Sequence, residues 1–394
     1  MQKLHREYPH LRFAKQWELT DNLLLLLGQC EAYVNAIINT PIMPTHYQKL
    51  MSVALVKGAQ ATTAIEGNTL TEEEINGLLK GQKLSPSREY LGIEVQNIYD
   101  ALNSLLDSIV DGNQDSLITT ELLKNFHKMV GKNLGDSFNA IPGQLRNADV
   151  IVGSYRCPDH RDVPFLLEQF CEFVKEYFKY GRKKQSFSEV IVQAIVLHIY
   201  IEWIHPFNDG NGRTGRLVEF YILLRGGSPD ISSHLLSNFY NQTRSEYYRQ
   251  IEKATATKNL TEFLEYAVLG FRDGLFETIK TIQGSQFEIT WRHLIYEKLE
   301  EIKDTFRDTK VFKRQRMLAL ELPLDKPFKI GDIPTLSVNL AVAYSKTSEK
   351  TISRDLNKLI DLELVNKAGN DYKTNTDSIK QLMARRKKIQ HIPT

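Results

Sequence analysis

The sequence predicts a mainly α-helical protein with a small β-hairpin and a C-terminal domain of winged-helix type. Apolar residues recur at helical spacing through the first two thirds of the chain, whereas β-branched residues alternate only near residue 150. A helix-turn-helix pattern followed by two short strands closes the chain. With 394 residues, 42% of them hydrophobic, the chain is long enough for two or three domains with apolar cores.

Four helices are predicted before residue 110, at positions 23–38, 47–65, 71–79 and 88–109. Prolines or a Gly-Asn pair separate them, and these residues interrupt helices. The second helix ends in the sequence Thr62-Thr63-Ala64-Ile65-Glu66-Gly67, where Gly67 is typical of a C-terminal cap.

The segment 139–163 is irregular and extended in character. Alternating β-branched residues bounded by glycine predict a hairpin within positions 149–155. We expect Arg146 to anchor the loop that precedes this hairpin. The candidate functional residues at its tip are Val152, Gly153, Ser154 and Tyr155.

Two predicted helices, 186–204 and 211–224, flank the loop that carries the candidate chemistry. Pro206 ends the first helix, and a Gly-Gly pair ends the second. Glycines at 210 and 212 let the backbone approach a ligand closely, and the free amides that begin the second helix attract anions. The junction reads His205-Pro206-Phe207-Asn208-Asp209-Gly210-Asn211-Gly212-Arg213-Thr214-Gly215-Arg216.

The side chains of this junction suit a nucleoside triphosphate held beside a proton acceptor. Arg213 and Arg216 lie three apart on one helix and can bind phosphate oxygens. Asp209 offers the carboxylate that Mg²⁺ needs when substrate phosphates supply other ligands. His205 can accept a proton near neutral pH. His198, on the preceding apolar helix, is instead expected to be a core histidine.

Downstream of the junction, helices are predicted at 239–256, 291–306 and 310–320. Prolines break the chain at 323 and 327, and a helix pair follows at 335–344 and 348–359, with Ser348 as N-cap. Residues 362–372 supply two short strands, which completes the winged-helix pattern. Its polar second helix and the basic tail could contact DNA phosphates through Lys350, Ser353, Arg354, Lys358 and Arg385-Arg386-Lys387-Lys388.

The charge distribution, the apolar runs and the cysteines limit the class of protein. The formal net charge is only +2, but residues 286–394 hold 21 lysines and arginines against 15 acidic residues. The apolar run at 23–27 is too short to span a bilayer and no signal sequence precedes it, so we expect a cytoplasmic protein without a membrane partner. Cys30, Cys157 and Cys171 match no metal-ligand spacing and are expected to be ordinary thiols.

The junction resembles the HxFx(D/E)GNGRxxR signature of the Fic-domain family, and every fixed position is matched. The resemblance implies a Fic-type helical bundle that catalyses attack of a protein Ser, Thr or Tyr hydroxyl on the α-phosphate of ATP. It implies His205 as general base and Asp209 as the Mg²⁺ ligand. The other nucleotide-binding positions that it implies are Gly210, Asn211, Gly212, Arg213, Thr214, Gly215 and Arg216.

Three further segments resemble parts of this family. Thr62, Glu66 and Gly67 fit its inhibitory pattern Ser/Thr-x-x-x-Glu-Gly/Asn, which implies that Glu66 pairs with Arg216 and displaces the γ-phosphate. The hairpin resembles the family's flap, which clamps a target segment by adding a strand and borders the nucleotide site. The pair Tyr247-Tyr248 resembles tyrosines that line the adenine side, although aromatic residues at this spacing are usually core.

The resemblance divides the chain into an N-terminal helical region with the inhibitory helix (1–110), a Fic core (111–285) and a winged-helix-like domain with a basic tail (286–394). We therefore expect an adenylyltransferase that inhibits itself through Glu66. Three alternatives stay open: a transferase of another nucleotide or group, a hydrolase that removes AMP from targets, and a DNA-binding regulator. The expected partner is a target protein docked on the flap, while self-modification, a homodimer, and DNA or protein at the winged helix also stay open.

Overall fold

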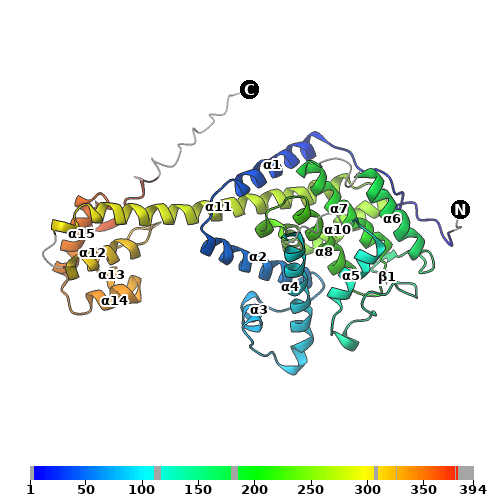
Figure 1. Ribbon diagram of the computed structural model, residues 1–394, viewed down its shortest axis with the longest axis horizontal. Coiled ribbons are helices and arrows are strands. Elements are labelled where there is room, and N and C mark those ends of the chain that lie inside the picture. The colour runs from blue at the N-terminus through cyan, green and yellow to red at the C-terminus, as the bar shows by residue number, and fades with distance from the viewer. Residues whose placement is uncertain are drawn as a thin grey trace. The chain divides into compact units, whose positions relative to one another are not determined.

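The computed structural model describes residues 4–110, 117–178, 185–305, 309–324, 326–377 and 379. Two compact units make up the chain, Met1–Lys280 and Thr281–Thr394. Within the described residues the secondary structure is helical except for two antiparallel two-stranded sheets. The predicted mainly α-helical class is therefore confirmed (Figure 1).

The first unit contains ten complete helices among its described residues. Four of them match the four helices predicted before residue 110, and the predicted helix 239–256 is split at Thr243 into two. The helices are α1 (Asp21–Ile38), α2 (Pro44–Ala64), α3 (Glu72–Leu79), α4 (Glu89–Val110), α5 (Thr120–Val130), α6 (Val163–Tyr177), α7 (Phe187–Ile204), α8 (Asn211–Arg225), α9 (Leu235–Gln242) and α10 (Arg244–Thr257), and α11 (Thr261–Glu300) begins in this unit.

Side-chain caps define where several helices begin. The hydroxyl of Thr20 accepts a hydrogen bond from the N–H of Leu23 and so starts α1. Reciprocal capping boxes start α3, between Thr71 and Glu74, and α7, between Ser186 and Glu189. Each cap satisfies amides that the first helical turn leaves without partners.

Helices α7 and α8 lie at the centre of the bundle (Figure 1). Helix α7 is apolar on nearly every side. It is long and apolar enough to cross a membrane by composition alone, but 78% of it is buried among the other helices, as expected for a core helix. The two helices approach closely at Gly215, where a Cβ would lie 2.8 Å from Nδ1 of His198. His198 is fully buried, as the sequence predicts for a core histidine.

The predicted hairpin is present as β1 (Ile151–Val152) and β2 (Tyr155–Arg156), with Val152 opposite Tyr155. Gly153 at the turn has a φ of +57°, a conformation that glycine adopts without strain. The hairpin belongs to the same unit as the loop between α7 and α8.

The second unit packs its own apolar core around Trp291, Leu340 and Leu356. The predicted helix 335–344 is interrupted at Ser337, whose hydroxyl caps the second part. After the end of α11, the second unit contains α12 (Thr309–Glu321), α13 (Ile333–Leu336), α14 (Val338–Tyr344), α15 (Glu349–Asp361), β3 (Val365–Ala368) and β4 (Asp371–Thr374). The helix pair and hairpin occur in the predicted order, the winged-helix assignment stays a prediction, and the basic tail at 385–388 lies outside the described residues.

Candidate functional site

The loop between α7 and α8 is closed by its own side chains. α7 ends at His205, whose φ of +49° places it in the left-handed region and turns the chain. The amide of Asn211 bonds both backbone groups of Phe207, accepting from its N–H and donating to its carbonyl at 2.9 Å each. The side chain of Asn211 is thus committed to the loop, so this residue can offer an anion only its backbone amide.

His205 presents a neutral imidazole. Burial lowers the pKa of His205 to about 4, so the ring is deprotonated at neutral pH and can accept a proton. Arg146 fixes the backbone on which it sits, since its Nε donates to the His205 carbonyl at 2.7 Å and its N–H to the Pro206 carbonyl at 3.0 Å. The anchoring role predicted for Arg146 is therefore observed.

Asp209 lies at the mouth of the loop. One carboxylate oxygen accepts from Nη2 of Arg213 at 2.7 Å, and the other from the N–H of Asn139 at 3.3 Å. Burial raises its pKa above the ordinary value. A third of the side chain is exposed, with a relative accessibility of 32%, and it adjoins the start of α8. These features fit a carboxylate that could bind Mg²⁺ together with phosphate oxygens.

Arg213 is held by two carboxylates. Its guanidinium pairs with Asp209 and with Glu94 of α4, and it lies 5.5 Å above the ring centroid of Phe138. Burial lowers its pKa to about 10, which leaves it charged at neutral pH. Arg213 consequently ties α4 to α8 and keeps a cation at the start of α8.

Arg216 is bound by the end of α2. Its guanidinium is 1% exposed, and its Nη2 donates to a carboxylate oxygen of Glu66 at 2.5 Å and to the main-chain carbonyl of Thr62 at 2.9 Å. Thr62 makes this contact through its backbone carbonyl and not through its hydroxyl. Burial acts most strongly and raises the pKa of Glu66, but the charge and hydrogen bond of Arg216, together with the charge of Arg213, lower the net pKa.

The carboxylate of Glu66 occupies the anion-binding start of α8. A Cβ at Gly212 would lie 2.3 Å from Oε1 of Glu66 and 3.0 Å from Nη1 of Arg216. Glycine at 212 is therefore required for this close approach. Nη1 and Nε of Arg216 have no hydrogen-bond partner among the described residues, so the guanidinium retains donors for further acceptors.

A glycine cap aims Glu66 at this position. Gly67 has a φ of +105°, its N–H donates to the Ala64 carbonyl at 3.0 Å, and the N–H of Asn68 donates to the Thr63 carbonyl at 3.2 Å. These two bonds form a Schellman motif, in which Glu66 is the last residue before the left-handed glycine. Gly67 can therefore cap α2 while Glu66 pairs with Arg216.

Comparison with known proteins gives a family match for the central part of the chain. Residues 117–223 match the Fic/DOC family. This chain carries a Fic domain. It is 27% identical to protein adenylyltransferase fic-1 of Caenorhabditis elegans over 212 residues, which cover 52% of this chain and 37% of that protein. Protein adenylyltransferase Fic of Aedes aegypti is 27% identical over 208 residues, covering 51% and 37%. The chain thus spans well under half the length of these curated relatives.

Solved structures support the fold. A Fic family protein from Desulfovibrio desulfuricans superposes with a TM-score of 0.54 at 18% identity, covering 92% of this chain and 98% of that one. A fragment of Fic-1 from C. elegans gives a TM-score of 0.54 at 22% identity, covering 67% and 72%. The Fic-type bundle expected from the junction sequence is therefore confirmed.

The β1–β2 hairpin, the candidate flap, has an exposed strand and an anchored strand. Ile151 and Val152 are 68% and 43% exposed. Tyr155 is anchored, because its hydroxyl donates to the Trp203 carbonyl of α7 at 2.6 Å and lies 2.8 Å from Nε2 of His10. Ser154 lies 3.4 Å from Glu252 of α10. The hairpin residues predicted as one group therefore differ in their surroundings: Val152 is exposed, whereas Tyr155 fixes the hairpin to α7.

The two predicted adenine-side tyrosines also separate. Tyr247 is 1% exposed and bonds His198 at 2.7 Å, in an aromatic cluster with Tyr240 and Phe263. It is a buried core residue, and its assignment to the nucleotide site stays a prediction. Tyr248 is 43% exposed, and its hydroxyl donates to the Ile65 carbonyl at 3.2 Å. It therefore contacts the end of α2 that carries Glu66.

Three further junction positions serve helix packing. Gly215 faces His198, and Thr214 is fully buried. Gly210, with a φ of +79°, would place a Cβ 2.9 Å from Phe138. Their close helix contacts position the first turn of α8, whose amides and arginines remain the groups able to bind phosphates.

Several site residues of the Fic domain were not predicted. Glu94 pairs with Arg213, and His127 stacks on Phe207 with ring centroids 3.7 Å apart while its Nε2 lies 2.9 Å from the Asp209 carbonyl. Glu202, three residues before His205, lies near Glu66, and burial raises its pKa to about 7. An acidic residue within the otherwise apolar second half of α7 is the signal that could have singled out Glu202.

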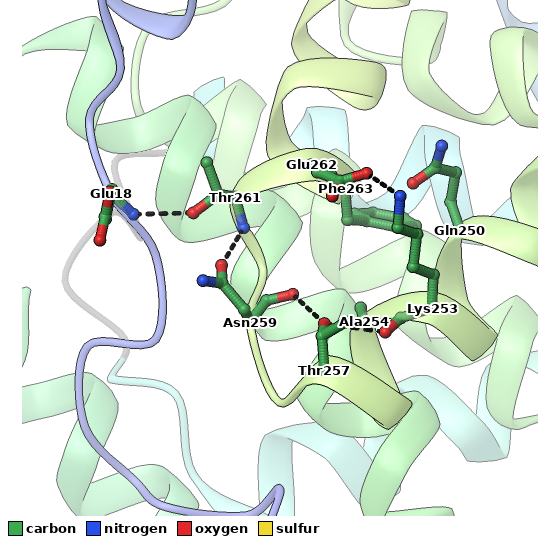
Figure 2. Close-up of a pocket in the computed structure, with 9 residues that line it drawn as sticks. All are labelled: Glu18, Gln250, Lys253, Ala254, Thr257, Asn259, Thr261, Glu262 and Phe263. Atoms are coloured by element: carbon green, nitrogen blue, oxygen red, sulfur yellow. Dashed lines mark hydrogen bonds and ion pairs between the residues drawn. The ribbon is translucent and has the colours of Figure 1, made fainter.

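A separate pocket of about 300 Å³ lies between α10, the start of α11 and the N-terminal segment (Figure 2). Its polar groups largely satisfy one another. Thr261 accepts from the N–H of Glu18 at 2.9 Å and donates its own N–H to Asn259 at 2.8 Å, while Lys253 pairs with Glu262. These contacts tie the N-terminal segment to α11, and no residue of the 205–216 junction lines the pocket.

Proposed function

We propose that this chain is a protein adenylyltransferase that moves AMP from ATP to a Ser, Thr or Tyr hydroxyl of a target protein. The observation that carries the proposal is the neutral imidazole of His205 beside the glycine-rich, arginine-bearing start of α8. A proton acceptor next to an anion-binding helix terminus is what hydroxyl attack on a phosphate requires. The names of the curated relatives support the same activity.

The chemistry follows from the positions of these groups. His205 takes the proton of the incoming hydroxyl, whose oxygen attacks the α-phosphorus of ATP. The bond between the α-phosphorus and the bridging oxygen breaks, and pyrophosphate leaves as AMP becomes esterified to the protein. Arg213, Arg216 and the backbone amides of the first turn of α8 hold the phosphates and stabilise the developing charge. Asp209 would bind Mg²⁺, which neutralises phosphate charge when present.

The proposal includes autoinhibition by Glu66. Its carboxylate binds the guanidinium that would hold the terminal phosphate and lies within the space above Gly212. ATP and Glu66 then compete for one cation, because a phosphate and a carboxylate bind a guanidinium through the same donors. ATP can enter productively only when Glu66 moves away.

The flap is the proposed docking place of the target. Ile151 and Val152 expose their side chains, and a two-stranded hairpin offers backbone groups at its edge. A target segment could add as a further strand, which recognises an extended backbone more than particular side chains.

The test uses purified wild-type protein, Glu66→Gly and Glu66→Gly combined with His205→Ala. Each is incubated separately with ATP, GTP, UTP and CTP, and modified peptides are identified by mass spectrometry. We expect an adenylyl group on a hydroxyl residue, strongest in Glu66→Gly and absent from the double variant. A different nucleotide would indicate another transferase on this fold, and no modification by any nucleotide would refute the proposal.

A further inference from the structure

We propose that the second unit binds duplex DNA through the exposed face of α15 and the adjacent β3–β4 hairpin. The elements α14 and α15 are joined by the short turn at 345–348, and the hairpin follows directly. Phe328 pairs with Tyr372, which adds a third segment to the hairpin beside β4. A helix-turn-helix with a flanking hairpin presents its second helix to a partner, as major-groove readers do.

The inner face of α15 holds the helix in place. Ile352, Leu356 and Leu359 are buried in the core of this unit. Asp355 is 1% exposed and accepts hydrogen bonds from Arg314 of α12 at 2.7 Å and from Tyr344 of α14 at 3.1 Å. These contacts fix α15 against both neighbours, so its outer face is not needed for folding.

The outer face of α15 carries hydrogen-bond donors and positive charge. Lys350, Arg354 and Asn357 are exposed at helical spacing, with Ser353 partly exposed beside them. Neither Lys350 nor Arg354 forms an ion pair with any residue that the structure describes. Lysine and arginine bind phosphates and guanine edges, and asparagine suits adenine.

The dimensions of α15 and its surroundings fit a duplex. Its 13 residues make a rod of about 20 Å, which can lie in a major groove about 12 Å wide. Lys367 and Lys373 are exposed on the hairpin that follows, and Lys346 is exposed in the turn that precedes α15. The acidic residues that α15 exposes are its first and last, Glu349 and Asp361, so both cations lie between them.

A protein partner is less favoured at this face because its outward residues are polar. Apolar side chains are exposed on α14 instead, where Val338 and Val342 are 80% and 70% accessible. These valines are the surface that would be implicated if DNA does not bind.

The test measures binding of a fluorescent 30-base-pair duplex of mixed sequence to the full chain by anisotropy, from about 50 to 200 mM salt. The variant is Lys350→Ala with Arg354→Ala. The control, Lys15→Ala with Lys49→Ala, removes the same charge from exposed positions in the first unit. Circular dichroism checks that all three proteins are folded.

We expect wild type and control to bind alike, and the α15 variant to bind at least about tenfold more weakly at 100 mM salt. Losing two phosphate contacts should also reduce the slope of log affinity against log salt by about 1.8. No binding by wild type at 50 mM salt, or equal loss in both variants, would overturn the proposal. If wild type binds no DNA, the exposed valines Val338 and Val342 of α14 would be the surface to test for a protein partner.

Discussion

Replacing Glu66 by glycine removes one contact whose strength can be worked out from the structure. Glu66 binds the 1%-exposed Arg216 guanidinium at 2.5 Å, and Arg216 keeps its bond to the Thr62 carbonyl in the variant. A hydrogen bond to a charged group contributes about 1.5–3 kcal/mol. If that free energy holds the site closed, Glu66→Gly should raise AMP transfer about 10- to 150-fold, since about 1.4 kcal/mol is a factor of ten.

The same change should separate stability from activity. Loss of Glu66 leaves a buried guanidinium with fewer acceptors, although Glu66 is 31% exposed and water can reach its position. We therefore expect a loss of about 1–3 kcal/mol in the free energy of unfolding without nucleotide. ATP should then stabilise Glu66→Gly more than wild type, because only the variant offers it a free Arg216.

The assay measures incorporation of labelled AMP and thermal unfolding with and without ATP. Glu73→Gly is the matched control, because it removes an exposed glutamate of α3. Arg216→Ala should abolish transfer with or without Glu66, so the two changes are non-additive. Unchanged transfer in Glu66→Gly, or equal activation by Glu73→Gly, would refute inhibition by this contact. Loss of AMP removal from a modified target in Glu66→Gly would favour the hydrolase alternative.

Three further variants test separate contacts. His205→Ala in the Glu66→Gly background should lose transfer and keep ATP affinity within about twofold by calorimetry, since the imidazole acts on the hydroxyl proton; normal transfer would show that another group is the base. Tyr248→Phe removes the hydroxyl that bonds the Ile65 carbonyl at 3.2 Å, and a loss of about 0.5–1 kcal/mol from the inhibitory segment should raise wild-type transfer about two- to fivefold in the same labelling assay. Glu202→Gln should become more stable relative to wild type as pH rises from about 5 to 8. The reason is that the folded-state pKa of Glu202 is raised to about 7, so wild type loses stability as this carboxyl ionises through that window; urea unfolding at both pH values measures the difference, and a constant difference would show that the carboxyl does not titrate there.

The sequence predicted the parts of this site whose function follows from local chemistry. The helix ends flanking 205–210, the left-handed glycines and the arginines of α8 depend on neighbouring residues, and short-range patterns capture them. The approach of Glu66 to Arg216 joins residues 150 positions apart and followed only from the family resemblance. Helical spacing alone carries no signal for such a contact.

Residues whose contacts were not predicted show what local patterns leave out. Tyr247 and Tyr248 are neighbours on α10. Tyr247 nevertheless packs in the aromatic core, whereas Tyr248 contacts the end of α2. Glu94 and His127 come from α4 and α5, which contact the junction only after the bundle has formed. Their roles depend on tertiary packing, which overrides local propensity.

The most direct test of the central claim compares two labels on ATP. Glu66→Gly is incubated with its target, or alone if it modifies itself, using ATP labelled at the α-phosphate in one reaction and at the γ-phosphate in the other. Attack on the α-phosphorus predicts protein-bound label from the α-phosphate only, with pyrophosphate released, and no label in the His205→Ala control. Label from the γ-phosphate, as in a kinase, or label that persists without His205, would contradict the account.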